Sequence, residues 1–320
     1  MEMPLKSRYV TVMGIFAADL SFRTGRLPGW GETVMGSAFR LGPGGKGSNQ
    51  AIAAARLGGT VNFISKVGTD PFGELARSVH RNAGVHLDYL FTTSDEATGA
   101  AAIIVDEASG ENAIVVAPCS ANALTFSDID FAREAIGKSA CFLTQFELPL
   151  PQVEYGLRLA RSLGVATILN PAPACECGDD LLQLCDYVTP NEHEASALTG
   201  MPVDTMSQIE RAAAALLARG TRHVVLTLGV RGAFVLGPHI AEHVEAFQIG
   251  TVVDTTGAGD AFNGAFAVGL AEGMSIIDAT RFGCAAAGLS VTRPGTATSM
   301  PEREEVDRLC RSLSVKTTDK

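Results

Sequence analysis

The sequence is poor in positive charge and contains no basic run. It has 25 Lys and Arg against 35 Asp and Glu, which gives a formal net charge of -10 at pH 7. Surfaces that bind nucleic acid gather Lys and Arg, and this sequence shows neither such a cluster nor basic residues interleaved with aromatic ones. The composition therefore excludes nucleic acid as the main partner, although a local site could still bind an anionic nucleotide.

Long apolar runs are also missing, and so is a secretory signal. No apolar run approaches the length of a membrane span, and residues 1–9 lack the basic-then-apolar order of a signal peptide. The seven cysteines are odd in number and show no CxxC spacing. Only Cys175 and Cys177 stand close together, with no His at a metal-ligand spacing. We expect reduced thiols and no disulfide framework, in a cytoplasmic protein without a membrane partner.

What the sequence does contain is a regular alternation of segments typical of strands and helices. Helical patterns over 49–57, 153–162 and 209–218 each end at a glycine, the usual helix stop. The alternation predicts an α/β fold with a mainly parallel sheet. No linker or repeat divides residues 1–320, and we expect a frayed polar tail at 315–320. Strands are expected at 9–16, 61–67, 140–146, 165–169, 187–189 and 223–228.

Two regions interrupt this alternation. Residues 19–41 carry no helical periodicity and are rich in glycine and turn residues. Residues 98–117 have the pattern of a hairpin, with strands at 100–105 and 113–117 and a polar turn between them. We expect the two regions to form a small antiparallel flap over one edge of the main sheet.

Residues 254–264 form the most informative segment, in which a glycine-rich loop opens a helix. Gly257 and Gly259 allow successive backbone N–H groups to point outward, and the helix dipole adds positive potential at the same point. Such a site attracts an anion, for example a phosphoryl group in transfer. Asp260 would repel that anion, so two interpretations are open. It is either a base that deprotonates an attacking hydroxyl or a residue that caps the helix.

A second glycine-rich loop also leads into a helix. Gly42, Gly44 and Gly47 satisfy G-x-G-x-x-G, but no strand of a βαβ unit precedes them, which disfavours a dinucleotide site. The loop also fails as a P-loop, because Gly47 stands where Ser or Thr follows the lysine. Lys46 and Asn49 remain as donors to a polar ligand, and the alternative is a tight turn with a solvated lysine.

Polar residues follow several predicted strands, where ligands gather in open α/β sheets. Asn191 and Glu194 share a face at a helix start, which suits hydrated Mg²⁺ or an ordinary capping box. Residues 227–232 suit a nucleotide or a β-turn, and residues 291–296 suit a monovalent cation or a simple turn. Three more residues end predicted strands on the same side: Asp19, Glu147 and Asn170. With the two glycine loops, this set suits phosphoryl transfer to a polyol better than hydride transfer.

The two glycine loops resemble the two signature segments of the ribokinase (PfkB-type) carbohydrate kinase family in residues, order and separation. The matching segments are Gly-Gly-Lys-Gly-Ser-Asn-Gln-Ala at 44–51 and Asp-Thr-Thr-Gly-Ala-Gly-Asp at 254–260. Segments 170–174, 190–194 and 227–232 resemble further blocks of the family. The resemblance therefore extends over nearly the whole chain.

The resemblance implies a single kinase domain over residues 1–320. Its fold would be a three-layer α/β/α sandwich with a mainly parallel central sheet and a small β lid at about 17–42 and 97–120, through which two copies dimerise. The enzyme would transfer the γ-phosphoryl group of ATP to the terminal (5-) hydroxyl of D-ribose, with Mg²⁺ as cofactor and K⁺ as an activating cation.

The resemblance also implies roles for individual residues of this chain. Asp260 is the base, and the anion hole consists of the N–H groups of Gly257, Ala258 and Gly259. The sugar is bound by Asp19, Gly45, Lys46, Asn49, Glu147 and Asp260. The nucleotide lies along Asn191, Thr227, Gly229, Gly232, Gly259 and Cys284, with Glu194 ordering Mg²⁺ and phosphate. K⁺ takes oxygens, mostly main-chain, from Asp254, Thr256, Ser290, Arg293, Gly295 and Ser299.

One position departs from the family pattern. In ribokinases the first strand ends in Asn-x-Asp and the Asn contacts sugar hydroxyls, whereas here Ala17 and Ala18 precede Asp19. Losing the amide weakens the selection for that hydroxyl. Deoxyribokinases, which are close relatives, also carry an apolar residue there, so 2-deoxyribose or another sugar such as fructose is the alternative substrate. Arg23 and Arg26 would suit a substrate that already bears phosphate, or a solvated flap face.

Two alternatives come from other functional classes. The chain could be a catalytically silent sugar- or nucleotide-binding protein, which the intact Asp260 and its glycine loop speak against. It could also be a nicotinamide-dependent oxidoreductase, which the context of residues 42–47 disfavours. An ATP-dependent sugar kinase is therefore the leading hypothesis.

Overall fold

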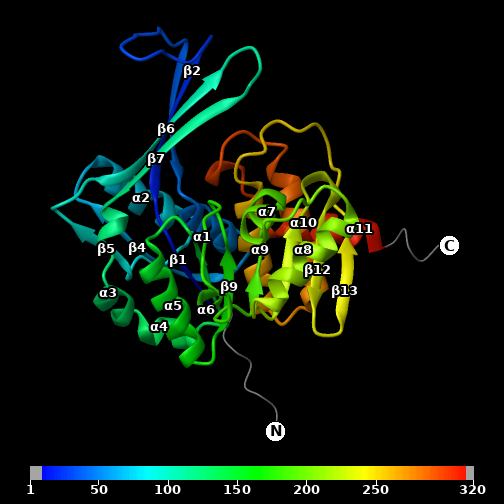
Figure 1. Cartoon of the computed structure of the whole chain (residues 1–320). Helices are drawn as coiled ribbons and strands as arrows, with labels where there is room; N and C mark the ends of the chain where they lie inside the picture. The colour runs from blue at the N-terminus through cyan, green and yellow to red at the C-terminus, as the bar shows by residue number, and fades with distance from the viewer. Residues whose placement is uncertain (1–8, 315–320) are drawn as a thin grey trace.

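A nine-stranded sheet forms the centre of the protein in the computed structural model, which describes residues 9–314 (Figure 1). From edge to edge the order is β13 (Ile240–Val244), β12 (Ala233–Gly237), β11 (His223–Thr227), β10 (Tyr187–Val188), β9 (Ala166–Asn170), β8 (Cys141–Gln145), β1 (Tyr9–Met13), β4 (Thr60–Gly68) and β5 (Leu90–Thr93). Neighbours run parallel, except that β12 is antiparallel to both β11 and β13. The predicted, mainly parallel sheet is confirmed, and the expected tail at 315–320 lies outside the described residues.

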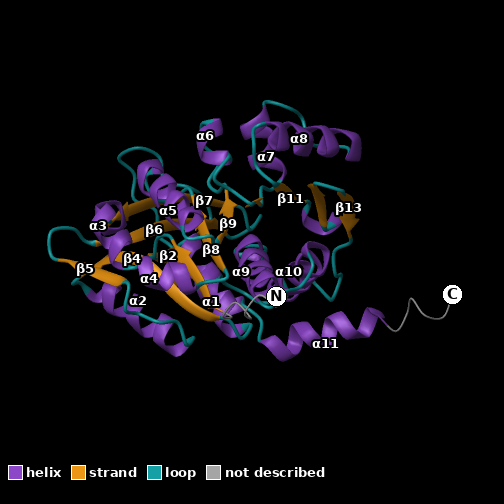
Figure 2. Ribbon diagram, turned by 90° about the horizontal axis from the view of Figure 1, so that it is seen from below, coloured by secondary structure: helices purple, strands orange, loops and turns teal. Residues whose placement is uncertain are grey.

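Helices cover both faces of this sheet, which confirms the three-layer α/β/α sandwich (Figure 2). Side chains alternate along a strand, so Val10 and Val12 of β1 pack on one face and Met13 packs on the other. The face of Met13 is covered by α3 (Phe126–Phe131), α4 (Arg133–Lys138), α5 (Leu150–Ser162), α6 (Asp179–Leu182), α7 (Glu192–Thr199) and α8 (Met206–Ala218). The face of Val10 is covered by α1 (Lys46–Arg56), α2 (Pro71–Asn82), α9 (Ala258–Ala271), α10 (Ile276–Ser290) and α11 (Arg303–Ser314).

Helix boundaries agree with the sequence pattern at one end only. Gly58, Gly164 and Gly220 stand two residues beyond α1, α5 and α8 with positive φ, so the predicted stops are confirmed. The same helices begin at 46, 150 and 206, three residues before the predicted 49, 153 and 209. A first turn is held by its cap and needs no apolar stripe, as in the capping box of Thr205 and Gln208 before α8. Within residues 9–314, no helix is long and apolar enough to cross a membrane.

The second sheet is the lid, four strands that project from the main body (Figure 1). Its order is β3 (Ala38–Gly44), β2 (Ala17–Thr24), β6 (Thr98–Asp106) and β7 (Asn112–Cys119). The β2–β3 and β6–β7 pairs are antiparallel as expected, but β2 and β6 are parallel, so the prediction of a wholly antiparallel flap is wrong. The reason is the long connection through α1, β4, α2 and β5, which returns the chain in the same direction.

The chain leaves β1 through a tight bend that brings the lid and α1 together. The strand predicted over 9–16 therefore stops at residue 13. A Cβ on Gly14 would lie 2.3 Å from Gln145 Oε1 and 2.8 Å from Gly47 Cα, so only glycine allows this approach. β1 lies between β8 and β4, where the strand order reverses. Open α/β sheets bind their ligands at such a point.

Candidate active site

A cavity of about 160 Å³ opens at the carboxyl ends of the parallel strands. Asn170 ends β9, Thr189 follows β10 and Thr227 ends β11, so three strand ends contribute to one wall. The remaining lining residues come from the loop after β9 and from the amino-terminal parts of α1, α7 and α9: Ala172, Lys46, Asn191, Glu194, Gly257, Gly259, Asp260 and Asn263. The cavity therefore joins both glycine-rich loops, which are some two hundred residues apart in the sequence.

Asp260 lies in the first turn of α9 and is buried, with 6% of the residue exposed. The cap of α9 is Gly257, so the interpretation of Asp260 as the helix cap is wrong. Its Oδ2 accepts a hydrogen bond from Asn49 Nδ2 and its Oδ1 accepts one from Gln50 Nε2, both at 2.9 Å. Burial raises the pKa of Asp260, while the charge of Lys46 and the two amides oppose that rise.

Small residues at the start of α9 bring backbone N–H groups to the cavity. Gly257, with a φ of 80°, and Gly259 both line it. The first N–H groups of a helix have no partner within the helix and carry the positive end of its dipole. Ala258 differs, because its N–H is directed at Thr255 O at 3.3 Å. Two of the three residues predicted for the anion hole therefore line the cavity.

Lys46 begins α1 among carboxylates. Its backbone N–H donates to Glu147 Oε2 at 2.7 Å. Burial lowers the pKa of the Lys46 ammonium, but the negative charges of Asp260, Glu147 and Glu194 outweigh that effect and raise it. Gly45 caps the helix with a φ of 87°, and a Cβ there would lie 2.6 Å from a carbonyl oxygen of the bend after β1. Because position 45 is a glycine, the loop can place the Lys46 ammonium close to these carboxylates.

Two more carboxylates at this site have raised pKa values. Burial raises the pKa of Glu147 to about 7, against the charge of Lys46. Burial and the charge of Asp260 raise the pKa of Asp19 to about 6. Asp19 lies against the lid strand β3, where a Cβ on Gly44 would be 2.0 Å from its Oδ1. The predicted sugar-binding carboxylates thus form one electrostatic cluster, although Asp19 and Glu147 do not themselves line the cavity.

Asn191 and Glu194 form the capping box of α7, which confirms that interpretation. Glu194 N–H donates to Asn191 Oδ1 at 2.8 Å, and the Glu194 carboxylate accepts from Asn191 N and Nδ2 at 2.9 and 3.0 Å. Both residues also line the cavity, and burial raises the pKa of Glu194. Carboxylate oxygens are the donors that Mg²⁺ prefers. Since residues 9–314 hold no cluster of three His, Cys, Asp or Glu suited to a metal, Mg²⁺ would also need oxygens from a bound phosphate.

The residues predicted along the nucleotide are only partly brought together. Thr227 lines the cavity, and its N–H donates to Pro190 O at 2.9 Å beside Asn191. Gly229 and Gly232 bound the turn after β11, and a Cβ on Gly232 would lie 2.0 Å from Val244 O. Cys284 is buried in the apolar layer of α10. Gly229, Gly232 and Cys284 are not among the described residues that line the cavity.

The residues predicted to hold K⁺ lie on two loops that contact each other. Asp254 and Val253 donate their N–H groups to Val291 O, and Ser290 O accepts from Arg293 N at 3.1 Å. Thr296 O accepts from both the N–H and the hydroxyl of Ser299, at 3.1 and 2.8 Å. Two further members, Thr256 and Gly295, donate their N–H groups to Asp254. The two loops therefore lie together, and the K⁺ role of these residues stays a prediction.

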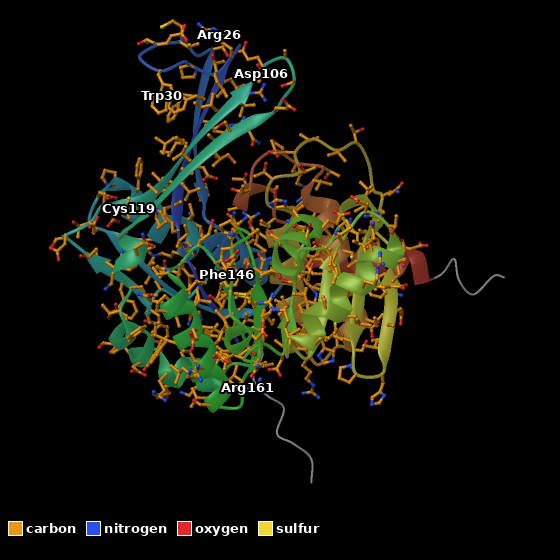
Figure 3. The ribbon with its side chains drawn as sticks, viewed as in Figure 1. Arg26, Trp30, Asp106, Cys119, Phe146 and Arg161 are labelled. Atoms are coloured by element: carbon orange, nitrogen blue, oxygen red, sulfur yellow. The ribbon has the colours of Figure 1, made fainter. Side chains whose placement is uncertain are left out.

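The lid arginines face solvent. Arg26 lies near the far end of the lid (Figure 3), forms an ion pair with Glu32 and has 58% of its side chain exposed. Arg23 is exposed on β2. The exposure of these arginines agrees with the interpretation as a solvated lid face, and their role toward a substrate phosphate stays a prediction.

Sequence reasoning missed four buried amide and hydroxyl side chains: Gln50 and Gln145 behind Asp260, and Thr189 and Asn263 in the cavity lining. Two of them offered a signal, because Gln145 and Thr189 are polar residues near the ends of the predicted strands 140–146 and 187–189. Gln50 directly follows Asn49 in the glycine loop. Asn263 stands one helical turn after Gly259 and donates to its carbonyl at 2.8 Å.

Comparison with known proteins defines the class to which this fold and site belong. Residues 7–303 match the pfkB family of carbohydrate kinases. The chain belongs to this family and is a phosphotransferase that acts on an alcohol group. The family resemblance seen in the two glycine loops is thereby confirmed.

Individual relatives match along almost the whole chain. The ribokinase of Haemophilus influenzae is 40% identical over 296 residues, which cover 92% of this chain and 96% of that protein. The deoxyribokinase of Salmonella typhi is 36% identical over 297 residues, with the same coverage of 92% and 96%. The structure of Arabidopsis thaliana ribokinase complexed with ribose and ATP is similar at a TM-score of 0.88 and 33% identity, covering 95% of this chain and 98% of that one.

Proposed function

We propose that the protein transfers the γ-phosphoryl group of ATP to the 5-hydroxyl of D-ribose, giving ribose 5-phosphate and ADP. The observation that carries this proposal is the buried carboxylate of Asp260, which lines the cavity together with Lys46 and the N-terminus of α9. A base and an anion site at the same point suit the attack of a hydroxyl on a phosphoryl group. The 40% identity to a ribokinase supports ribose as the sugar.

In this proposal Asp260 accepts the proton of the attacking hydroxyl. The N–H groups of Gly257, Ala258 and Gly259 stabilise the charge that develops on the transferring group. The N–H of Ala258 would have to leave Thr255 O to take part. Because there is little covalent chemistry for the protein to perform, positioning and electrostatic stabilisation account for most of the rate.

The sugar is proposed to lie between the lid base and Asp260, in contact with Asp19, Gly45, Lys46, Asn49 and Glu147. Asn49 supports this placement, because its Oδ1 is buried without a hydrogen-bond partner among the described residues while its Nδ2 is used by Asp260. A sugar hydroxyl would satisfy that oxygen. Lys46 would bind a further hydroxyl and balance the surrounding acids.

ATP is proposed to lie along Asn191, Thr227, Gly229, Gly232, Gly259 and Cys284. Glu194 would hold Mg²⁺ or its water, and Mg²⁺ when bound neutralises charge on the phosphates. K⁺ is proposed between the loops of Asp254 and Gly295. The proposal is supported by Asp254, which joins the two loops by accepting the N–H groups of Thr256 and Gly295.

A specific observation favours 2-deoxyribose as the second candidate substrate. Ala17, at the start of β2, is buried beside the sugar-binding Asp19 and offers no hydrogen-bonding side chain. The 36% identity to a deoxyribokinase is in keeping with this alternative. Selection between the two sugars would then depend on a single hydroxyl group.

We further propose that residues 1–320 act as one kinase domain that dimerises through the lid in the cytoplasm. The lid exposes large apolar side chains, which is unusual for a surface that stays in water. These are Phe22, Phe39, Leu41, Ile114, Val115 and Val116. The strand register places Phe22, Phe39, Leu41 and Val115 on one face of the lid. A second copy of the same sheet packed on that face would bury them.

The direct test is ADP release over a panel of ribose, 2-deoxyribose, fructose, sugar phosphates and nucleosides. We expect D-ribose to give the highest kcat/KM, with 2-deoxyribose next. A higher kcat/KM for 2-deoxyribose would favour the second candidate. ATP binding without ADP release on any sugar would favour a catalytically silent binding protein.

A further inference from the structure

A chain of buried amide side chains lies directly behind Asp260. Gln50 Nε2 donates to Asp260 Oδ1 at 2.9 Å and to Asn170 Oδ1 at 3.0 Å. Gln145 Nε2 in turn donates to Gln50 Oε1 at 2.6 Å. Gln50 has no exposed surface and does not line the cavity. The carboxylate is therefore held from the side that faces away from any substrate.

Every polar group of the Gln50 side chain is used. Its two N–H groups bond to Asp260 and Asn170, and its oxygen accepts from Gln145. No donor remains for a sugar or a phosphate. Its neighbour Asn49 differs, because Asn49 Oδ1 has no partner among residues 9–314. The two adjacent amides thus have different tasks, and that of Gln50 is confined to the protein.

The far end of the chain determines which way the Gln50 amide points. Asn170 Nδ2 donates to the backbone oxygen of Thr189 at 3.1 Å, an atom that can only accept. Asn170 Oδ1 must therefore face Gln50 and needs a donor there. A reversed Gln50 would set its oxygen against Asn170 Oδ1 and the Asp260 carboxylate. Desolvated contacts between like groups are costly, so one orientation is strongly favoured.

We propose that Gln50 is a positioning residue for Asp260, held in its donating orientation by Asn170 and bonded at its oxygen by Gln145, so that the carboxylate stays in place to accept the hydroxyl proton. This inference rests on the proposed function of Asp260 as the base. It adds a relay that ties the base on α9 to the ends of β8 and β9. A shift of either strand end would reach Asp260 through one amide group.

The charges around Asp260 determine the sign of the effect. Lys46 faces it from α1, Asp19 from the lid, Glu147 from the segment after β8 and Glu194 from α7. Burial raises the pKa of Asp260, and the Gln50 hydrogen bond lowers it by favouring the ionised form. Loss of Gln50 therefore raises the pKa of Asp260. As the pH is lowered, the carboxylate should then become protonated, and activity should fall, at a higher pH than in the unmodified enzyme.

The experiment compares kcat, sugar KM and the pH profile of kcat/KM across four variants. Gln50→Met removes the donor at similar volume. We expect kcat to fall about tenfold or more, as for a buried bond to a charged group. Sugar KM should change little, and the acid limb should move up by about one pH unit. Gln145→Met leaves the contacts of Asp260 intact. It should lower kcat and move the acid limb up as well, but by less than Gln50→Met.

The double variant and a matched control complete the design. If Gln145 acts only through Gln50, the variant with both substitutions should equal Gln50→Met. Thr11→Val is the control, since it removes a buried hydrogen bond to Ser139 Oγ at 2.7 Å outside the site. It should lower the melting temperature without moving the acid limb. ATP binding by calorimetry shows that each variant is folded.

Several results would overturn the inference. These are an unmoved acid limb in Gln50→Met, additive effects in the double variant, or the same limb shift in Thr11→Val. Asp260→Asn separates the two proposals. If that variant keeps near-normal turnover, the role of Asp260 as base fails; if it is inactive while Gln50→Met behaves as wild type, only the relay fails.

Discussion

Asp254 accepts the Gly295 N–H at Oδ2 over 2.9 Å, and so ties the loop before α9 to the loop after α10, 41 residues further on. Its Oδ1 accepts the Thr256 N–H at the same distance. The next residue is Gly257, the cap of α9. The geometry of the anion site therefore depends on a loop that is distant in sequence, and a cation held between the two loops would act on the site directly.

Activity should accordingly depend on K⁺. We expect kcat to fall severalfold when Na⁺ replaces K⁺ at constant ionic strength, because the carbonyls of both loops would hold the larger cation. Asp254→Ala should abolish this difference by freeing the two loops. Asp106→Ala is the matched control, since Asp106 accepts two N–H groups in the lid turn. Equal rates in K⁺ and Na⁺ for the unmodified enzyme would contradict the cation site.

Asp260→Asn should reduce kcat by about 10² to 10⁴-fold, the usual contribution of a general base. ATP affinity should be retained, because the amide is close in shape to the carboxylate and the N-terminus of α9 is unchanged. Asp278→Asn provides the control, as Asp278 occupies the equivalent third position of α10 but is exposed. Steady-state ADP release and calorimetry with ATP give the two readouts. Turnover near that of the control would remove Asp260 from the role of base.

The stability of the ligand-free protein should depend on Glu147. Burial raises its pKa from the usual 4.5 to about 7, so between these values the folded state binds more protons than the unfolded state. The free energy of unfolding contributed by this group therefore falls as pH rises from about 4.5 to about 7. Glu147→Gln keeps an acceptor for the Lys46 N–H and should flatten that dependence. Urea unfolding at several pH values tests this, and parallel profiles for both proteins would exclude it.

Ala17→Asn should shift selection toward ribose. An amide beside Asp19 could bond the hydroxyl that 2-deoxyribose lacks, and one such bond changes the ratio of kcat/KM values about tenfold. Ala17→Leu has a similar volume without the amide and should lower activity on both sugars equally. If the two variants give the same ratio, packing at the base of β2 and not hydrogen bonding determines the choice of sugar.

Val115→Lys should weaken the dimer. Val115 lies on β7 of the lid and is 72% exposed, and a buried lysine at a sheet-to-sheet contact would be costly. Phe131→Lys is a matched control on α3, where the side chain is 70% exposed outside the lid. Light scattering across a concentration series should show dissociation for the first variant only. A monomer at all concentrations for the unmodified protein would contradict dimerisation through the lid.

Local signals predicted much of the main fold. The glycines after α1, α5 and α8 and the apolar strands between them were sufficient for a parallel sheet between two helical layers. The antiparallel hairpin of β12 and β13 at the edge of the main sheet was missed. The strands before it are parallel, and the sequence contains no signal that the strand direction changes there. The association of the two lid regions was predicted, but the parallel direction of β2 and β6 was beyond reach, since partners such as Ala18 and Ala100 are separated by the long connection through α1, β4, α2 and β5.

The candidate site divides in the same way. The sequence by itself determined the glycine loops, the acid at the start of α9 and the polar strand ends, because these depend on backbone freedom and helix dipoles within a few residues. Only the tertiary structure decided that Asp260 is no cap, that Lys46 stands among the three carboxylates of Asp260, Glu147 and Glu194, and that Gln50 donates to Asp260. The hydrogen bond from Gln50 to Asp260 spans 210 residues, and a contact of that separation depends on how the sheet brings α1 beside α9, not on any local pattern.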